Sequence, residues 1–180
     1  MVHQRLRRGG FGYLKQRITA FNQMAQRVMP VLLLTDLDRS GCPAELINAW
    51  LPVGASPRLL FRVAVRETES WLLADRPAFA DFLGISIGTV PDRPDELTDP
   101  KAALLDLVRK SKRRELRQEI LPRPGVSFPV GLGYNDQWCR FVRDHWEIGR
   151  AAKASPSLAR AVERLAQFSE KDRVLPPRYS

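Results

Sequence analysis

Two short, continuously apolar runs in the chain predict buried strands. The first covers residues 31–35 between Pro30 and an acidic residue, and the second covers residues 59–65, where Arg62 is the one polar residue. Runs of this kind are typical of parallel strands that are covered on both faces. A helical pattern follows each run, so the order predicts an α/β layer with parallel pairing. Because two strands are few for a stable sheet, we expect further strands in weaker segments or a missing piece of the fold.

Apolar residues at helical spacing predict helices along the rest of the chain. The predicted ranges are about 13–27, 43–50, 70–75, 77–83, 99–121, 136–146 and 156–168, and loops are expected at 3–12, 85–98 and 121–135. Asp99 followed by Pro100 marks the start of the longest helix, and Ser155 is the expected cap of the last one. The predicted fold class is α/β, with a small, mostly parallel sheet, flanking helices and a helical C-terminal half. We expect one domain over residues 1–170, with its core at about 30–83, its helical half at about 99–168 and a flexible tail at 171–180.

Composition and charge narrow the class of protein. The 180 residues are 44% hydrophobic and 27% charged, which is ordinary globular usage and excludes a disordered or fibrous chain. No apolar stretch approaches the roughly 20 residues of a membrane span, and two cysteines do not make a disulfide framework, so we expect a cytoplasmic protein without a membrane partner.

The net charge of +9 is distributed unevenly along the chain, since residues 1–30 carry +6, residues 31–100 carry −5, residues 101–125 carry +5 and the remainder +3. An acidic middle between basic arms suggests a metal site beside phosphate-binding surfaces, or a surface whose charges balance.

Two pairs of acidic residues follow the predicted strands. Asp36 and Asp38 end the first run, and Glu67 and Glu69 repeat the same spacing after the second. Ligands bind outside the carboxyl ends of strands in open parallel sheets, and carboxylates two residues apart can share one hard cation. The hypothesis is therefore a Mg²⁺ or Mn²⁺ site on Asp36, Asp38 and Glu67, with Glu67 as a base and Glu69 assisting. Capping of helix N-termini by these acids is the alternative.

The segments around these acids resemble a family. Residues 31–38 (VLLLTDLD), followed by Cys42-Pro43, and residues 62–75 (RVAVRETESWLLAD) resemble an uncharacterised Toprim-like bacterial family whose signature is a strand ending in DxD and a strand ending in ExExWLLxD. The resemblance covers residues 30–83 and implies a Toprim-like fold, in which Asp36 and Asp38 bind Mg²⁺. Toprim enzymes also use a glutamate upstream of the DxD, whereas no acidic residue precedes Asp36 here. Three alternatives remain open: a shortened N-terminus, Glu67 as the base, or a fold kept without catalysis.

A cluster of basic residues lies in the longest predicted helix. If that helix is continuous, one face carries Lys110, Arg113, Arg114 and Arg117. Such a face would bind nucleic-acid phosphates, or it would be a solvated face neutralised by nearby acids. The leading functional hypothesis is a Mg²⁺-dependent nucleic-acid-processing domain that cleaves phosphodiesters. The alternative is a non-catalytic module that binds nucleic acid or a partner protein, and the oligomeric state is left open.

Overall fold

The computed structural model describes residues 10–37, 41–65, 67–125 and 127–174, the last six by their backbone alone. It shows an α/β fold with a small parallel sheet and flanking helices. The chain divides into two compact units: unit 1 is Met1–Val65 with Glu163–Ser180, and unit 2 is Arg66–Val162. The single domain over residues 1–170 stays a prediction. None of the helices in the described ranges is long and apolar enough to cross a membrane.

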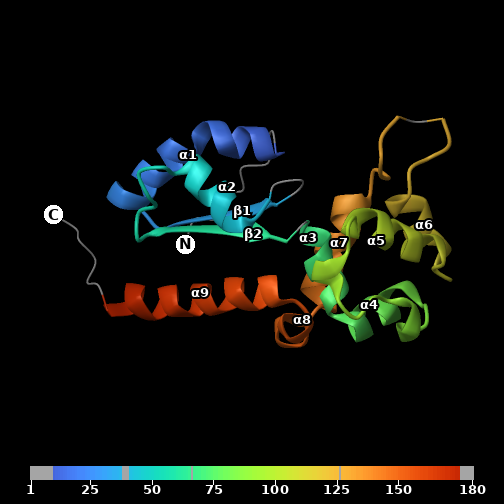
Figure 1. Ribbon diagram of the computed structural model, residues 1–180. Coiled ribbons are helices and arrows are strands. Elements are labelled where there is room, and N and C mark those ends of the chain that lie inside the picture. The colour runs from blue at the N-terminus through green and yellow to red at the C-terminus, as the bar shows by residue number, and fades with distance from the viewer. Residues whose placement is uncertain (1–9, 38–40, 66, 126, 175–180) are drawn as a thin grey trace. The chain divides into compact units, whose positions relative to one another are not determined.

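Unit 1 contains the sheet. Along the chain it consists of α1 (Gly10–Arg27), β1 (Val31–Asp36), α2 (Pro43–Trp50), β2 (Leu59–Ala64) and the C-terminal part of α9 (Pro156–Val174). The two strands pair in parallel, in register from Val31 opposite Leu59 to Asp36 opposite Ala64, which confirms the predicted pairing. Helices α1 and α2 lie on one side of the sheet, and the unit 1 part of α9 lies on the other (Figure 1).

The core of unit 1 fills one face of the sheet. Phe21 from α1 and Trp50 from α2 pack with Leu33 of β1 and with Phe61 and Val63 of β2. The rings of Trp50 and Phe61 stack with their centroids 5.3 Å apart. Side chains alternate between the faces of a strand, so odd-numbered strand residues enter this core and even-numbered ones face away from it.

Burial of β1 differs from the sequence prediction. Leu32 and Leu34 are 53% and 40% exposed, whereas a strand covered on both faces was expected. In β2 the corresponding Leu60 is buried. No third strand occurs within the described ranges, so both strands are edge strands, and the face of β1 that carries Leu32 and Leu34 is only partly covered. A continuous apolar run therefore does not show that both faces of a strand are covered.

Unit 2 is helical. Its helices are α3 (Thr68–Ala74), α4 (Arg76–Leu83), α5 (Pro100–Arg109), α6 (Arg114–Ile120), α7 (Tyr134–Asp144), α8 (Ile148–Ala154) and the first turns of α9, with 3₁₀ turns at Ile87–Thr89 and Pro94–Glu96. Four aromatic side chains form the centre of its core: Phe79 stacks on Trp138 at 5.5 Å, and Phe82 contacts Phe141 at 5.1 Å. Buried aromatic pairs of this kind contribute about 0.5–1.5 kcal/mol each beyond the burial of their area.

The longest predicted helix is interrupted. Helix α5 ends at Arg109 and α6 begins at Arg114 because the side chain of Ser111 is buried between them. The Ser111 hydroxyl donates to the Leu83 carbonyl at 2.5 Å and accepts from the Arg113 amide at 3.1 Å. Serine side chains that bond to the backbone in this way compete with helical hydrogen bonds.

The other helix boundaries differ less from the sequence prediction. Helix α1 begins at Gly10, inside the segment expected to be a loop, and α8 was not predicted at all. The cap of α9 is confirmed, because the Leu158 amide donates to the Ser155 hydroxyl at 3.2 Å.

Candidate functional site

The first acidic pair lies at the carboxyl end of β1. Asp36 is the last residue of the strand, partly buried and opposite Ala64 of β2. Asp38 lies outside the described residues. No group of three or more His, Cys, Asp and Glu side chains that could hold a metal ion occurs in the described ranges. A metal site on Asp36, Asp38 and Glu67 therefore stays a prediction.

The second acidic pair, Glu67 and Glu69, is bound by a lysine from α5. Lys101 Nζ lies 3.6 Å from Glu67 Oε1 and 3.4 Å from Glu69 Oε1. The Lys101 amide also donates to Glu67 Oε2 at 2.9 Å. These contacts form because the acids lie at the start of α3 and the lysine lies in the first turn of α5. The ammonium group thus contacts both carboxylates, as a shared cation would.

A tyrosine completes this arrangement. Tyr134, the first residue of α7, donates its hydroxyl to Glu69 Oε1 at 2.7 Å, and the Thr68 hydroxyl lies 3.4 Å from Glu69 Oε2. Burial raises the pKa of Tyr134 above its ordinary value, and the charge of Glu69 raises it further. We call Glu67, Glu69, Lys101 and Tyr134 the glutamate cluster. Its Glu69 side chain is only 8% exposed, so the cluster joins α3, α5 and α7 in the interior of unit 2.

Within the glutamate cluster, Glu67 is the more accessible acid. Its side chain is 20% exposed. Burial raises the pKa of Glu67 above its ordinary value, although the Lys101 amide and ammonium oppose this shift. The negative charges of Glu69 and Asp99 add to the rise. The carboxylate therefore remains less stable in its charged form than in water, even beside the lysine.

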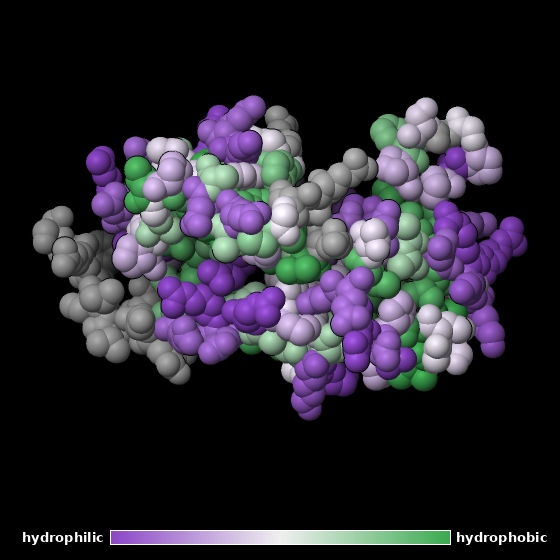
Figure 2. All heavy atoms as spheres, viewed as in Figure 1, coloured by the Kyte–Doolittle hydropathy of each residue, from purple (hydrophilic) through white to green (hydrophobic). Residues whose placement is uncertain are grey.

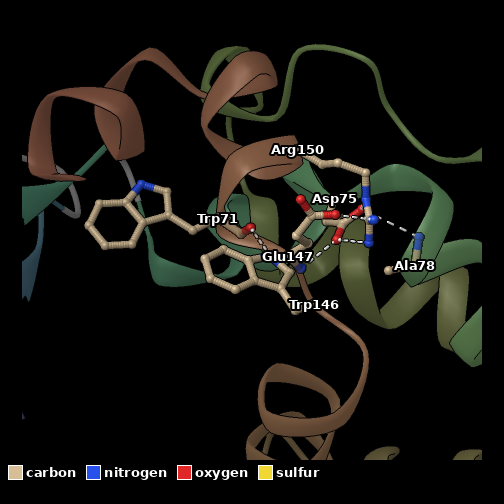
Figure 3. Close-up of polar contacts among 6 residues, drawn as sticks. All are labelled: Trp71, Asp75, Ala78, Trp146, Glu147 and Arg150. Carbon is tan, nitrogen blue, oxygen red and sulfur yellow. Dashed lines mark hydrogen bonds and ion pairs between the residues drawn. The ribbon is translucent and has the colours of Figure 1, made fainter. Parts of the chain in front are cut away.

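The remainder of the ExExWLLxD segment is structural. Asp75 is fully buried and accepts from Arg150 Nε and Nη2, both at 2.9 Å, and from the Glu147 amide at 2.7 Å (Figure 3). Trp71 donates from its indole to the Ser157 hydroxyl at 2.7 Å, and the Trp146 indole donates to the Trp71 carbonyl at 3.0 Å. These contacts attach α8 and the start of α9 to α3 and α4.

Arg150 was not identified from the sequence, because α8 was not predicted and Arg150 lies 75 residues after Asp75. The bidentate geometry, two parallel N–H groups on one carboxylate, is a strong form of ion pair. We call Asp75, Glu147 and Arg150 the Asp75 clamp.

The predicted phosphate-binding residues do not share one helix face. Lys110 directly follows α5, and Arg113 directly precedes α6, so the interruption at Ser111 separates them. Arg113 Nη2 donates to the Asp81 carbonyl at 3.0 Å, and Arg117 donates to the Ser111 carbonyl. Arg114 and Lys110 are exposed. Arg113 and Arg117 thus bind the backbone around the interruption. The prediction of one continuous basic helix face is therefore wrong.

Ion pairs are distributed unevenly between the units. The seven ion pairs between described residues all lie in unit 2. Unit 2 holds 16 Lys and Arg against 14 Asp and Glu, a net charge of +2, whereas unit 1 holds 13 against 6, a net charge of +7. The excess positive charge therefore lies in unit 1.

Comparison of the chain with protein-family models, with curated protein sequences and with solved structures returned no match. The Toprim-like resemblance therefore stays a prediction.

Proposed function

We propose that the protein is a non-catalytic nucleic-acid-binding module whose unit 1 contacts the phosphate backbone. The observation that carries this proposal is the net charge of +7 on unit 1, against +2 on unit 2. Excess charge of one sign costs stability through self-repulsion. A polyanion removes that cost and gains entropy from released counterions.

The glutamate cluster supports binding without catalysis. Glu67 and Glu69 would be the base and its assistant in a metal-dependent reaction, but both carboxylates contact the ammonium of Lys101. A divalent cation would have to compete with a cation that is covalently part of the chain. The cluster is explained by its role in joining α3, α5 and α7.

The test is binding in the presence and absence of metal. Fluorescence anisotropy with labelled DNA and RNA oligonucleotides should show affinity that falls between about 50 and 200 mM salt, because log K decreases by about 0.9 per phosphate contact for each unit of log salt on duplex DNA. EDTA should leave the affinity unchanged, and the oligonucleotides should stay intact with Mg²⁺ or Mn²⁺. Absence of binding at low salt, or cleavage that EDTA abolishes, would contradict the proposal.

A second candidate is the Mg²⁺-dependent processing domain with a Toprim-like fold. It is favoured by the position of Asp36 at the carboxyl end of β1, the edge where ligands bind in parallel sheets. Titration calorimetry with Mg²⁺ or Mn²⁺ tests it on the wild type and on the double variant Asp36→Ala/Asp38→Ala. Binding that the double variant loses supports the metal site, and equally negligible binding in both removes it.

A further inference from the structure

Helix α1 presents an exposed polar stripe on the side that faces away from the sheet. Its other side enters the core of unit 1 through Ile18, Phe21 and Ala25. The stripe consists of Gln16, Thr19, Gln23 and Gln26, all of which are exposed. The last three follow the first by three, seven and ten residues, a spacing that places all four on one helix face. Figure 2 shows hydrophilic side chains on unit 1 at the edge where Figure 1 places α1.

Cations border this stripe on both sides. Because an α-helix has 3.6 residues per turn, Lys15 lies about 100° to one side of Gln16 around the helix axis and Arg17 lies about 100° to the other. Arg27 lies at the C-terminal end of the stripe, and all three cations are exposed. The Arg17 guanidinium also lies over the Tyr13 ring, 5.3 Å from its centroid, which holds that side chain at the helix surface.

Helix α1 carries charge of one sign only. Its 18 residues include these three cations and no acidic residue. The other helices of ten or more residues, α5, α7 and α9, each carry both signs. Protein surfaces ordinarily mix the two signs, and opposite charges one helical turn apart stabilise a helix. The outer face of α1 is therefore complementary in charge to a polyanion.

The amides of the stripe are available to a partner. Asn22, which lies beside the stripe, holds the loop before β2: its Nδ2 donates to the Gly54 carbonyl at 3.1 Å, and its Oδ1 accepts from the Ser56 amide at 2.7 Å. The amides of the three stripe glutamines take part in no hydrogen bond between described residues. The core contacts and the Asn22 bonds fix α1 on unit 1 while its outer face stays open.

We propose that the outer face of α1 binds in the major groove of duplex DNA. This groove is about 12 Å wide and admits one α-helix. Cations on both sides of the stripe match the phosphates that border the groove, and glutamine amides can bind the edge of adenine through two hydrogen bonds. From Gln16 to Gln26 the stripe is about 15 Å long, which corresponds to about four base pairs.

This inference rests on the proposed function, since it names the element of unit 1 that binds and the class of nucleic acid that it binds. Duplex RNA is the less suitable ligand, because its major groove is too narrow for side chains to read.

Chemical protection identifies the groove. A short DNA duplex of mixed sequence is treated with dimethyl sulfate in the presence and absence of the full chain. The reagent methylates guanine N7, which lies in the major groove, and adenine N3, which lies in the minor groove. Saturating protein should reduce methylation at N7 and leave N3 unchanged. Protection of N3 instead, or unchanged N7 on a duplex that is fully bound, would overturn the inference.

Side-chain amide signals of the ¹⁵N-labelled full chain identify the helix face. The signals of Gln16, Gln23 and Gln26 should shift saturably with the DNA duplex and not with an RNA duplex of the same sequence. Gln118, an exposed glutamine on α6 of unit 2, is the control and should not shift.

A matched pair of charge changes tests the phosphate contacts. Arg27→Gln should lower the slope of log K against log salt by about 0.9, the value for one phosphate contact on duplex DNA. Arg164→Gln makes the same change of charge in the same unit, on the part of α9 that lies on the other side of the sheet, and should leave the slope unchanged. Circular dichroism of both variants confirms that they are folded.

The outcomes separate the two proposals. Oligonucleotide binding that Arg27→Gln and Arg164→Gln weaken equally would overturn the role of α1 and leave the proposed function standing. Equal shifts with DNA and RNA duplexes would overturn the major groove as the site and still support nucleic-acid binding. If no oligonucleotide binds at low salt, the proposed function itself is contradicted.

Discussion

At the scale of single residues, the partner of a side chain decides its role. The sequence predicts Glu67 and Glu69 as a base and its assistant, and it places Asp75 in the same motif, but each of these acids contacts a cation that follows much later in the chain. Lys101 lies 34 residues after Glu67, and Arg150 lies 75 residues after Asp75. Sequence spacing identifies which residues end a strand or start a helix. It does not identify a partner that only tertiary packing brings within hydrogen-bond distance.

Tyr134→Phe should destabilise the protein. The substitution removes the hydroxyl that donates to Glu69 Oε1 and leaves a buried carboxylate with fewer partners. Losing one hydrogen bond to a buried charged group costs about 1–3 kcal/mol of unfolding free energy. Urea unfolding measures it, with Tyr13→Phe as the control, because no hydrogen bond between described residues uses the Tyr13 hydroxyl. Equal stability of the two variants would contradict the role of Tyr134.

Glu67→Gln should change how stability depends on pH. The pKa of Glu67 is raised above its ordinary 4.5 in the folded protein, so the unfolded chain ionises first as pH rises. The contribution of Glu67 to stability is therefore greatest below that ordinary value and is lost as pH rises through the folded pKa. Glutamine does not titrate but can still accept from the Lys101 amide.

The expected result is that the stability of Glu67→Gln relative to the wild type increases from about pH 4 to about pH 7. Urea unfolding at several pH values measures this difference. Glu96→Gln, at an exposed ion pair with Arg93, is the control and should show little pH dependence. A relative stability of Glu67→Gln that falls over the same range would show that the pKa of Glu67 is lowered instead.

At the scale of elements, the sequence predicted most helices and both strands, and its errors have local causes. The pairing of β1 with β2 and the cap at Ser155 are confirmed. The continuous helix over residues 99–121 is wrong because Ser111 bonds to Leu83 across unit 2, a contact that helical periodicity does not contain. Helix α8 was missed because its sequence, IGRAAKA, has few large apolar residues to give a helical pattern.

Arg150→Met should detach α8 from the rest of unit 2. It removes both guanidinium contacts to Asp75 and leaves a fully buried carboxylate with two backbone donors. Breaking a pair of this kind costs about 3–5 kcal/mol when both partners are buried, and less here because Arg150 is 44% exposed, so about 2–4 kcal/mol is expected.

Lys153→Met makes the same type of change on the same helix and should cost less than about 0.5 kcal/mol. Chemical unfolding measures both variants, and amide hydrogen exchange locates the effect. Faster exchange confined to α8 and the start of α9 in Arg150→Met supports the clamp, whereas a loss of stability no larger than that of Lys153→Met would contradict it.

At the scale of the whole molecule, charge is separated between the units. The sequence shows an acidic middle between basic arms, but the fold divides that middle and combines its residues 66–100 with the basic residues 101–125 in unit 2, which is nearly neutral at +2. The basic N-terminal arm belongs to unit 1, which carries +7. The helical spacing of the basic residues predicted phosphate contacts at Lys110, Arg113, Arg114 and Arg117. We propose unit 1 instead, because it carries the larger net charge and because Arg113 and Arg117 of the predicted helix bind backbone carbonyls.

The most direct test compares two sets of charge-neutralising substitutions in oligonucleotide binding. The unit 1 set is Lys15→Gln, Arg27→Gln, Arg58→Gln and Arg62→Gln, and the unit 2 set is Lys110→Gln, Lys112→Gln, Arg114→Gln and Arg123→Gln. Anisotropy at several salt concentrations gives the affinity and its salt dependence for each set. The unit 1 set should reduce affinity and flatten the salt dependence by about 0.9 for each lost phosphate contact, while the unit 2 set stays close to the wild type. A larger loss in the unit 2 set, or equal losses in both, would contradict the assignment of nucleic-acid binding to unit 1.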